Sequence, residues 1–330
     1  MSRVSDRLNR LSYSQTFVMS NKARDMKAAG IDVISLTLGE PDFDVPANIK
    51  QAAFDAINQN FSHYSPVPGF LELRKAIVNK LKRDNNLEYK PTQICVANGA
   101  KQNIFNVLAA LVNEGDEVIL PAPYWVSYDE MVKINGGVSV FIETNIDTEF
   151  KMTAEQLEAA ITPKTKAVLY SSPCNPSGSY YTREELEKIA NVMAKYPYVT
   201  IISDEIYEYI NYDGKHTSIA EFPQVYEQTA VINGMSKAFA MTGWRIGYSA
   251  CPEWLADACD KLQGQVTSGA NTVAQRASIV GLETDPKDYY YMVESFEKRR
   301  NLVYELLKEV PGFKVNLPKA AFYFFPDISY

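Results

Sequence analysis

At 330 residues the chain exceeds the usual size of a single hydrophobic core, so two domains, or one large α/β domain with an added layer, are expected. Its 46% hydrophobic and 22% charged residues are typical of a globular protein, and no apolar run is long enough to cross a bilayer. A net charge of −7 argues against nucleic acid as the main partner, because a polyanion requires a basic face. The N-terminal residues lack the apolar segment of a secretory signal, so the sequence predicts a cytoplasmic location.

Cysteine and histidine are too sparse to indicate a metal site. The four cysteines are widely separated and form no CxxC pair: Cys95, Cys174, Cys251 and Cys259. Only His63 and His216 are available to complete a zinc site. We therefore expect four reduced thiols and no structural metal.

The first predicted element is an amphipathic helix over 17–29, with Gly30 standing where a helix commonly ends. A short apolar run, 33–38, then leads into the turn-rich loop 39–43. Gly39 in this loop has two interpretations, a plain turn or a point where the backbone approaches a ligand closely, and spacing alone favours the turn.

Two further helices are predicted before the first strand. Pro46 suits the first turn of a helix that runs to about residue 59, and the following segment 63–69 is too rich in Pro and Gly to be regular. Another helix begins at Phe70. Its apolar residues recur at helical spacing and define one buried face: Phe70, Leu73, Ile77 and Leu81.

From residue 93 onward, short β-like runs alternate with helical segments. The predicted strands are 93–97, 117–120, 138–142, 166–171, 198–203, 229–233 and 245–250. This alternation is typical of a mostly parallel sheet covered by helices. Ligands of such sheets bind beyond the carboxyl ends of the strands, so the loops after these runs are the places to look for chemistry.

Two of the intervening helices have recognisable starts. Thr153 with Gln156, and Thr182 with Glu185, have the spacing at which a hydroxyl and an amide or acid satisfy each other's free backbone N–H groups. Both pairs therefore predict helix N-termini.

The composition changes over 285–310, which predicts a long helix leaving the sheet. The runs 313–315 and 321–325 beyond it are predicted as strands of a second, smaller sheet. The chain is accordingly divided into an N-terminal arm with part of the small domain, a large domain, and the rest of a small domain that is expected to be incomplete: 1–45, 46–290 and 291–330.

The stretch 236–248, Ser-Lys-Ala-Phe-Ala-Met-Thr-Gly-Trp-Arg-Ile-Gly-Tyr, places one lysine among apolar residues and glycines. Such a lysine usually lies with its stem along the hydrophobic layer and its charge in water. If Lys237 is instead desolvated, its amine becomes a better nucleophile, suited to a Schiff base with an aldehyde. Local chemistry alone favours the first interpretation.

The whole thirteen-residue stretch resembles the lysine motif of the class I aminotransferases, which depend on pyridoxal 5′-phosphate (PLP), and within them most resembles the bacterial aspartate aminotransferases. The resemblance implies that Lys237 forms the Schiff base with PLP and later acts as the base. It also places Ser236 at the cofactor. Further matching residues occur in the family's order along essentially the whole chain.

The loop 98–102 follows a predicted strand and opens a helix. Small residues at a helix N-terminus expose N–H groups to an anion, but a strand, a glycine and a helix also make an ordinary connection. The resemblance implies that Gly99, Ala100 and Lys101 hold the cofactor phosphate. It adds Arg245, whose planar fork is suited to paired hydrogen bonds with a phosphate.

Trp125 follows the strand that ends near residue 120, where a tryptophan is either part of the core or a stacking surface for a flat ring. Asn175 precedes a proline and by itself indicates only a turn. The resemblance implies that Trp125 stacks on the pyridine and that Asn175 donates to its phenolic oxygen. The family motif usually reads N-P-T-G, so Ser177 is a departure that retains a hydroxyl. Gly39, Trp125 and Asn175 are also the candidate substrate contacts.

Asp204 ends an apolar strand, where a carboxylate needs a partner or caps a following helix. The resemblance implies that its partner is the pyridinium nitrogen and that Tyr207 shares the phenolic oxygen with Asn175. It also implies that Tyr64 reaches the phosphate of a neighbouring subunit. The active sites of a homodimer are then shared.

The implied reaction is a ping-pong transamination between an L-amino acid and a 2-oxo acid, with aspartate and 2-oxoglutarate as the expected pair. Aminotransferases for aromatic amino acids, prephenate or alanine, and carbon–sulfur lyases, remain alternatives, because the matched residues concern the cofactor. A non-enzymatic regulator on this scaffold is a weaker alternative. The family's arginine for the substrate α-carboxylate lies beyond 321–325, so little transamination is expected of the chain as written.

Overall fold

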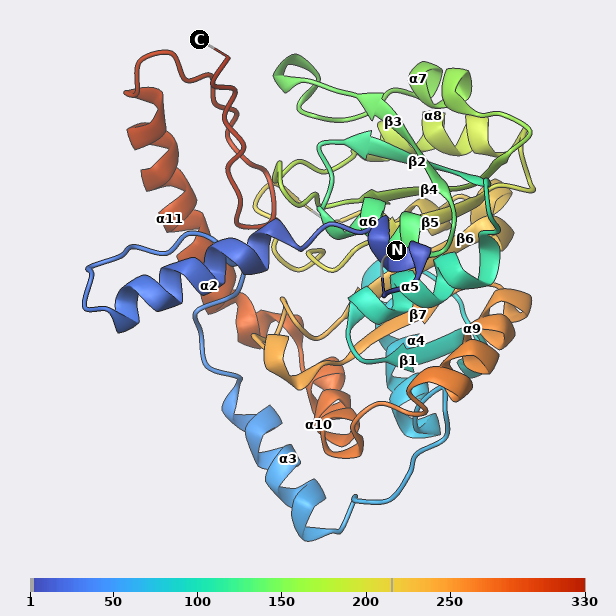
Figure 1. Cartoon of the computed structure of the whole chain (residues 1–330). Coiled ribbons are helices and arrows are strands. Elements are labelled where there is room, and N and C mark those ends of the chain that lie inside the picture. Colours follow the sequence, from blue (N-terminus) through green and yellow to red (C-terminus); the bar gives the residue numbers. More distant parts are fainter. Residues whose placement is uncertain (1–2, 215, 330) are drawn as a thin grey trace.

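The computed structural model describes residues 3–214 and 216–329, so Tyr330 lies outside the described residues. Its centre is a seven-stranded sheet in the order β1-β7-β6-β5-β4-β2-β3 (Figure 1). The strands are β1 (Ile94–Ala97), β2 (Glu117–Ala122), β3 (Val138–Glu143), β4 (Thr165–Ser171), β5 (Thr200–Asp204), β6 (Thr229–Gly234) and β7 (Gly247–Ala250). β7 runs antiparallel to both of its neighbours, and the other pairs are parallel. The predicted mostly parallel α/β sheet is confirmed.

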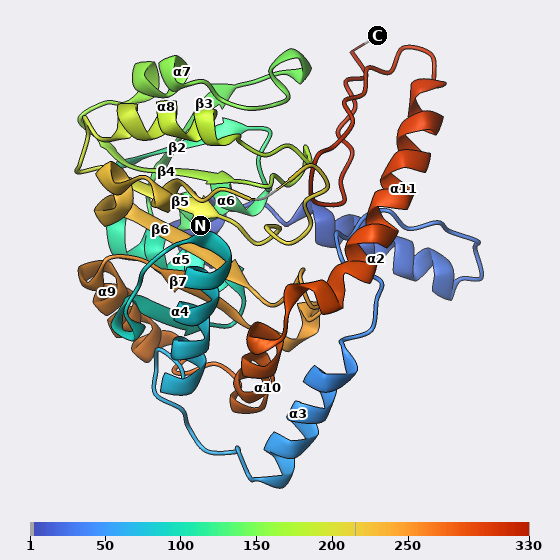
Figure 2. The ribbon, with the colours of Figure 1, turned by 180° about the vertical axis from the view of Figure 1, so that it is seen from behind.

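Helices cover both faces of the sheet. The α-helices of the described residues, not all of which lie on the sheet, are α1 (Asp6–Asn9), α2 (Gln15–Ala28), α3 (Ala47–Asn58), α4 (Leu71–Asn85), α5 (Ala100–Leu111), α6 (Ser127–Ile134), α7 (Ala154–Ala160), α8 (Arg183–Met193), α9 (Glu253–Val266), α10 (Thr272–Glu283) and α11 (Tyr290–Lys308). Along β1, Cys95 packs with α5, α6 and α9, whereas Val96 packs with α4 and α10. The alternation of strand side chains thus divides the core into two layers, and Figures 1 and 2 show them from opposite sides.

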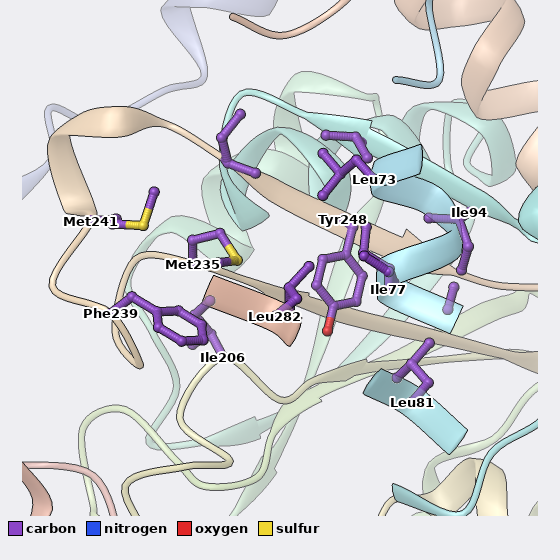
Figure 3. Close-up of a cluster of buried hydrophobic side chains, with 14 of the residues drawn as sticks. Leu73, Ile77, Leu81, Ile94, Ile206, Met235, Phe239, Met241, Tyr248 and Leu282 are labelled. Atoms are coloured by element: carbon purple, nitrogen blue, oxygen red, sulfur yellow. The ribbon is translucent and has the colours of Figure 1, made fainter. Parts of the chain in front are cut away.

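The apolar face predicted for the helix after Phe70 is present in α4. Leu73, Ile77 and Leu81 are fully buried, and Phe70 is half-buried at the N-cap. Figure 3 shows these leucine and isoleucine side chains around the ring of Tyr248, which belongs to the stretch singled out in the sequence. One end of that stretch is therefore fixed by the core.

Both predicted helix starts are confirmed. Thr153 accepts a hydrogen bond from the Gln156 N–H at 3.2 Å, and Thr182 accepts one from the Glu185 N–H at 3.3 Å. In each case the longer side chain bonds back to the N-cap N–H, so each N-terminus has its free donors satisfied.

The two strands predicted over 313–315 and 321–325 do not form, and this prediction was wrong. Lys314 and Asp327 make only an isolated antiparallel bridge, with N–H···O distances of 3.0 and 2.9 Å. Ala321 has a positive φ of 54°, which turns the chain and ends any extended run. The neighbouring peptide groups bond to loops of the large sheet instead of to another strand.

The long helix predicted over 285–310 is present as α11, preceded by a 3₁₀ turn, Pro286–Tyr289. In Figures 1 and 2 α11 lies beyond the sheet, and the C-terminal segment runs back beside it. The proposed domain boundary near residue 290 coincides with the start of this helix, and the division into domains remains a prediction. Among the described residues, no helix is both long enough and apolar enough to span a membrane.

Candidate active site

The sheet brings the candidate residues to one edge. β2, β4, β5 and β6 are parallel, so their carboxyl ends meet there, and β7 starts at this edge because it is antiparallel. The residues that follow or precede these ends are Trp125, Asn175, Asp204, Tyr207, Lys237 and Arg245. This is the edge at which ligands of open α/β sheets bind.

Lys237 follows β6 and is mostly buried. Its Nζ donates a hydrogen bond of 2.5 Å to the carbonyl oxygen of Gly39 and lies 5.7 Å from the ring centres of both Tyr207 and Phe322. Burial lowers the pKa of the Lys237 amine to about 8. The partly buried position of Lys237 favours the desolvated interpretation over the solvated one that local chemistry favoured.

Asp204 ends β5 and is buried. Its carboxylate accepts a hydrogen bond of 2.6 Å from the Tyr128 hydroxyl and one of 3.2 Å from the Ile206 N–H. Burial outweighs these bonds and raises the pKa of Asp204 to about 6. The alternative that Asp204 caps a helix is wrong, since a non-helical turn follows it. A buried carboxylate of this kind is stabilised by a nearby cation.

The polar ends of Asn175 and Tyr207 meet, as their predicted common role requires. They meet at the hydroxyl of Tyr323, which hydrogen-bonds to the Tyr207 hydroxyl and lies 3.3 Å from Asn175 Nδ2. A Cβ at Gly39 would lie 2.2 Å from the same hydroxyl. Gly39 is thus required for close approach, by a side chain of the protein, and not for a turn conformation.

Gly99 and Arg245 form a cradle at the N-terminus of α5. The Arg245 guanidinium donates to the Asn98 carbonyl at 3.1 Å, and a Cβ at Gly99 would lie 2.4 Å from its Nη2. Gly99 has a φ of +86°, which suits glycine. A Cβ at Gly247 would lie 2.1 Å from the backbone nitrogen of Ala100, so β7 packs directly against this loop. The two segments predicted to share an anion are therefore in contact.

Lys101 and Trp125 stack at the mouth of the same edge. Lys101 Nζ lies 4.9 Å from the Trp125 ring and 5.9 Å from the ring of Phe17. Burial, and secondarily the charge of Arg245, lower the pKa of the Lys101 ammonium. Trp125 also packs edge-on against Tyr128 at 5.5 Å, so its indole plane is fixed.

Tyr64 is the candidate residue that the structure does not bring to the others. Its side chain is 96% exposed. Ser236 lies in the buried segment beside Lys237, as expected.

Sequence reasoning missed Tyr128 and Tyr323. Tyr128 reaches Asp204 across 76 residues of sequence, and Tyr323 reaches Tyr207 across 116. Tyr128 stands three residues after Trp125, one helical turn away, which is the only hint in the sequence. Tyr323 lies in a run that reads as an ordinary strand.

A buried cluster of charges lies next to Asp204. Glu205 bonds to His216 Nε2 at 2.9 Å, and Glu208 pairs with the ammonium of Lys80 and accepts 2.7 Å from Asn85. Burial is the largest single effect on the His216 ring and lowers its pKa, but the charge and the hydrogen bond of Glu205 together outweigh it, so the pKa of His216 is raised. Two carboxylates and a histidine resemble a metal-ligand set, but Lys80 already supplies a cation to Glu208.

The residues present fit the expected cofactor. PLP carries an aldehyde, a pyridine nitrogen and a phosphate, and the site offers a group for each. These are the Lys237 amine with its lowered pKa, the buried Asp204 carboxylate, and the Gly99 cradle with the Arg245 guanidinium.

Comparisons with known proteins identify the family of this chain. The family model described as aminotransferase class I and II matches residues 31–330. A "Probable aspartate/prephenate aminotransferase" of Rhizobium leguminosarum bv. phaseoli is 47% identical over 329 residues, covering 99% of this chain and 82% of that protein. An "Aspartate aminotransferase" of Bacillus sp. (strain YM-2) is 48% identical over 328 residues, covering 99% of this chain and 83% of that protein.

Solved structures give the same result. The aspartate aminotransferase from Rhizobium meliloti superposes with a TM-score of 0.96 at 41% identity, covering 100% of this chain and 83% of that one. The Thermus thermophilus aspartate aminotransferase with maleate has a TM-score of 0.95 at 39% identity, covering 99% of this chain and 85% of that one. The chain therefore belongs to the aminotransferase class I and II family, the PLP-dependent aminotransferases.

Proposed function

We propose that the chain transfers the amino group of aspartate to 2-oxoglutarate by a ping-pong mechanism. The observation that carries the proposal is the partly buried Lys237 amine, with a pKa of about 8, at the sheet edge that also holds the buried Asp204. The names of the relatives support aspartate as the donor. Maleate, a dicarboxylate, is the ligand named for the Thermus thermophilus structure.

When bound, PLP supplies an electron sink that stabilises negative charge at the substrate α-carbon. The Asp204 carboxylate keeps a positive charge at the opposite side of that sink, because an ionised carboxylate in a buried site holds a cation strongly. Lys237 takes the α-proton and returns it. A pKa of about 8 leaves a useful share of the amine unprotonated near neutral pH while it remains basic enough to accept a proton.

The cradle formed by Gly99 and Arg245 would bind the phosphate of the cofactor. The N–H groups at the start of α5, around Gly99 and Ala100, face an anion together with the guanidinium of Arg245. By the same resemblance, Lys101 also contacts the phosphate and Ser236 lies at the cofactor. Asn175 and Tyr207 would hold the phenolic oxygen, and Trp125 would offer its indole face to the ring.

We further propose a homodimer in which Tyr64 contacts the phosphate bound by the neighbouring subunit. A tyrosine that is 96% exposed in the single chain suits this role. Segments 1–45 and 291–330 then belong to the smaller domain, and 46–290 form the large one. A cytoplasmic location is part of the same proposal.

The second candidate activity is transamination of prephenate. It is favoured by the names of relatives that pair aspartate with prephenate. A panel of amino donors and acceptors separates these activities, with aspartate, aromatic amino acids, alanine and cystathionine as donors and 2-oxoglutarate and prephenate as acceptors. Turnover is expected to be low overall, and aspartate with 2-oxoglutarate is expected to give the highest kcat/KM.

The central assignment is tested by covalent attachment. Incubation of the protein with PLP, followed by borohydride reduction and peptide mass spectrometry, should add one pyridoxyl phosphate to the peptide containing Lys237. In Lys237→Ala this adduct should be absent and turnover should fall by about a thousandfold or more, because both nucleophile and base are lost. Lys90→Ala, which removes an exposed lysine, should label as the wild type does. A dominant adduct elsewhere in the wild type would refute the assignment.

A further inference from the structure

Tyr323 touches three parts of the site at once. Its hydroxyl bonds to the hydroxyl of Tyr207, lies 3.3 Å from Asn175 Nδ2, and lies against Gly39, where an added Cβ would come within 2.2 Å. Gly39 in turn accepts the hydrogen bond of Lys237 at 2.5 Å. No other hydroxyl of the described residues joins these groups.

The segment that carries Tyr323 is tied to the same loops that supply its partners. The Ala320 N–H donates to the Gly178 carbonyl at 3.0 Å, three residues after Asn175. The Ala321 N–H donates to the Ile210 carbonyl at 2.8 Å, three residues after Tyr207. The positive φ of Ala321 reverses the chain between these bonds and the ring of Tyr323. The backbone that precedes Tyr323 is thus held at two points.

The ring of Tyr323 is packed as well. It lies edge-on to Tyr207 at 5.5 Å and 4.9 Å from the ring of Phe322. Gly178 leaves no room for a side chain, since a Cβ there would lie 2.9 Å from the carbonyl oxygen of Tyr323. Few rotamers are available to a tyrosine so enclosed, which pre-organises its hydroxyl.

Counting protons shows that either hydroxyl can be the donor in the bond between Tyr207 and Tyr323. Burial raises the pKa of Tyr207 well above its ordinary value and raises the pKa of Tyr323 too, so both are protonated near neutral pH. The pair therefore has two protons, of which one lies between the oxygens. If Tyr323 is the donor, the proton of Tyr207 is free for a third acceptor, and Asn175 can donate to the oxygen of Tyr323.

We propose that Tyr323 is a positioning residue that donates its hydroxyl proton to Tyr207 and so directs the proton of Tyr207 to the phenolic oxygen of the cofactor. This inference rests on the proposed role of Tyr207 at that oxygen. A hydroxyl that accepts a hydrogen bond becomes a stronger donor itself, so Tyr323 strengthens the contact that Tyr207 makes.

The test compares Tyr323→Phe with the wild type and with Tyr207→Phe in the full 330-residue chain. Phenylalanine keeps the packed ring and removes only the hydroxyl. Two quantities are measured: the Kd for PLP, and the pH midpoint at which the visible absorbance band of the PLP-loaded protein changes. Tyr181→Phe is the matched control, since its buried hydroxyl bonds to the Met152 N–H and to none of the site residues above.

Tyr323→Phe is expected to weaken PLP binding by about three- to tenfold, the effect of one hydrogen bond. The pH midpoint should rise by about half a unit, in the direction of Tyr207→Phe and by less, because a weaker donor stabilises an anionic oxygen less. Tyr181→Phe should change neither quantity.

Three results would overturn the inference. Tighter PLP binding by Tyr323→Phe would show that the hydroxyl competes with the cofactor. A midpoint that moves in Tyr207→Phe but not in Tyr323→Phe would leave the proposed function intact and remove the role of Tyr323. An unmoved midpoint in Tyr207→Phe would remove the role of Tyr207 and the inference with it.

Discussion

At Asp204, burial and hydrogen bonding act in opposite directions on one carboxyl group. Removal from water favours the protonated form, while the donors Tyr128 and Ile206 favour the carboxylate, and burial prevails. The pKa of about 6 lies above the ordinary value of 3.8. The site therefore maintains a charge that is unfavourable for the fold until a cation is bound beside it.

Asp204→Asn is expected to stabilise the cofactor-free protein at pH 8. The folded pKa exceeds the unfolded one, so the stability associated with Asp204 is fully present below about pH 4 and is lost as the pH rises through 6. A difference of about two units corresponds to at most about 3 kcal/mol. Thermal denaturation without PLP should show a higher Tm for Asp204→Asn at pH 8 and no gain at pH 4, with weaker PLP binding.

Tyr128→Phe provides the opposite control. It removes a donor that lowers the pKa of Asp204, so this pKa should rise further and the cofactor-free protein should lose stability at pH 8. Equal Tm values of Asp204→Asn and the wild type across the pH range would contradict this account.

The β6–β7 connection acts as one unit. It leaves the sheet after Gly234, carries Lys237 and Arg245, and returns at Gly247, which packs directly on the Gly99–Ala100 turn. The Lys237 amine and the Arg245 guanidinium are both positioned by the strand pair β6 and β7. A shift of β7 is therefore expected to displace the Gly99–Ala100 turn, which we propose holds the phosphate.

Gly247→Ala should disturb both stability and cofactor binding. Its Cβ would lie 2.1 Å from the Ala100 nitrogen, so backbone must shift, at about 1–3 kcal/mol. The displaced turn should weaken PLP binding by about tenfold or more. Gly243→Ala is the matched control in the same stretch, because nothing lies within 4 Å of its Cβ. Denaturant unfolding and PLP titration measure both effects. Equal behaviour of the two variants would refute the packing argument.

In the molecule as a whole, the candidate site lies at the sheet edge and Tyr64 stands apart from it, fully exposed. Other large apolar side chains on the surface of this single chain are Tyr13, Ile34 and Leu36. Exposed aromatic and aliphatic groups of this kind suit an interface with a second copy.

Shared sites can be tested with a hybrid dimer. Lys237→Ala and Tyr64→Ala chains are co-expressed with different affinity tags, and the species bearing both tags is purified. If Tyr64 serves the neighbouring subunit, one of the two sites contains both residues, and about half of the wild-type activity should return. A Lys237→Ala dimer with both tags should remain inactive. If the hybrid shows only the mean of the two parent variants, each subunit uses its own tyrosine.

The sequence by itself determined the sheet, the starts of its helices and the order of the site residues. Some patterns act between residues that are close in the chain, such as alternating strand runs and the capping pair Thr182 with Glu185. Such patterns can be recognised from the sequence alone. The roles of Lys237 and Arg245 came from a resemblance carried by thirteen consecutive residues. Local periodicity also predicted two strands near the C-terminus that do not form.

The tertiary structure alone decided which side chains meet. Whether Lys237 is desolvated depends on what covers it, and the partners of Asp204 and Tyr207 lie 76 and 116 residues away. Gly39 looked like a turn because spacing does not reveal that a tyrosine near the other end of the chain occupies the space of its side chain. Contacts between distant segments are set by packing, and packing leaves no pattern in either segment taken alone.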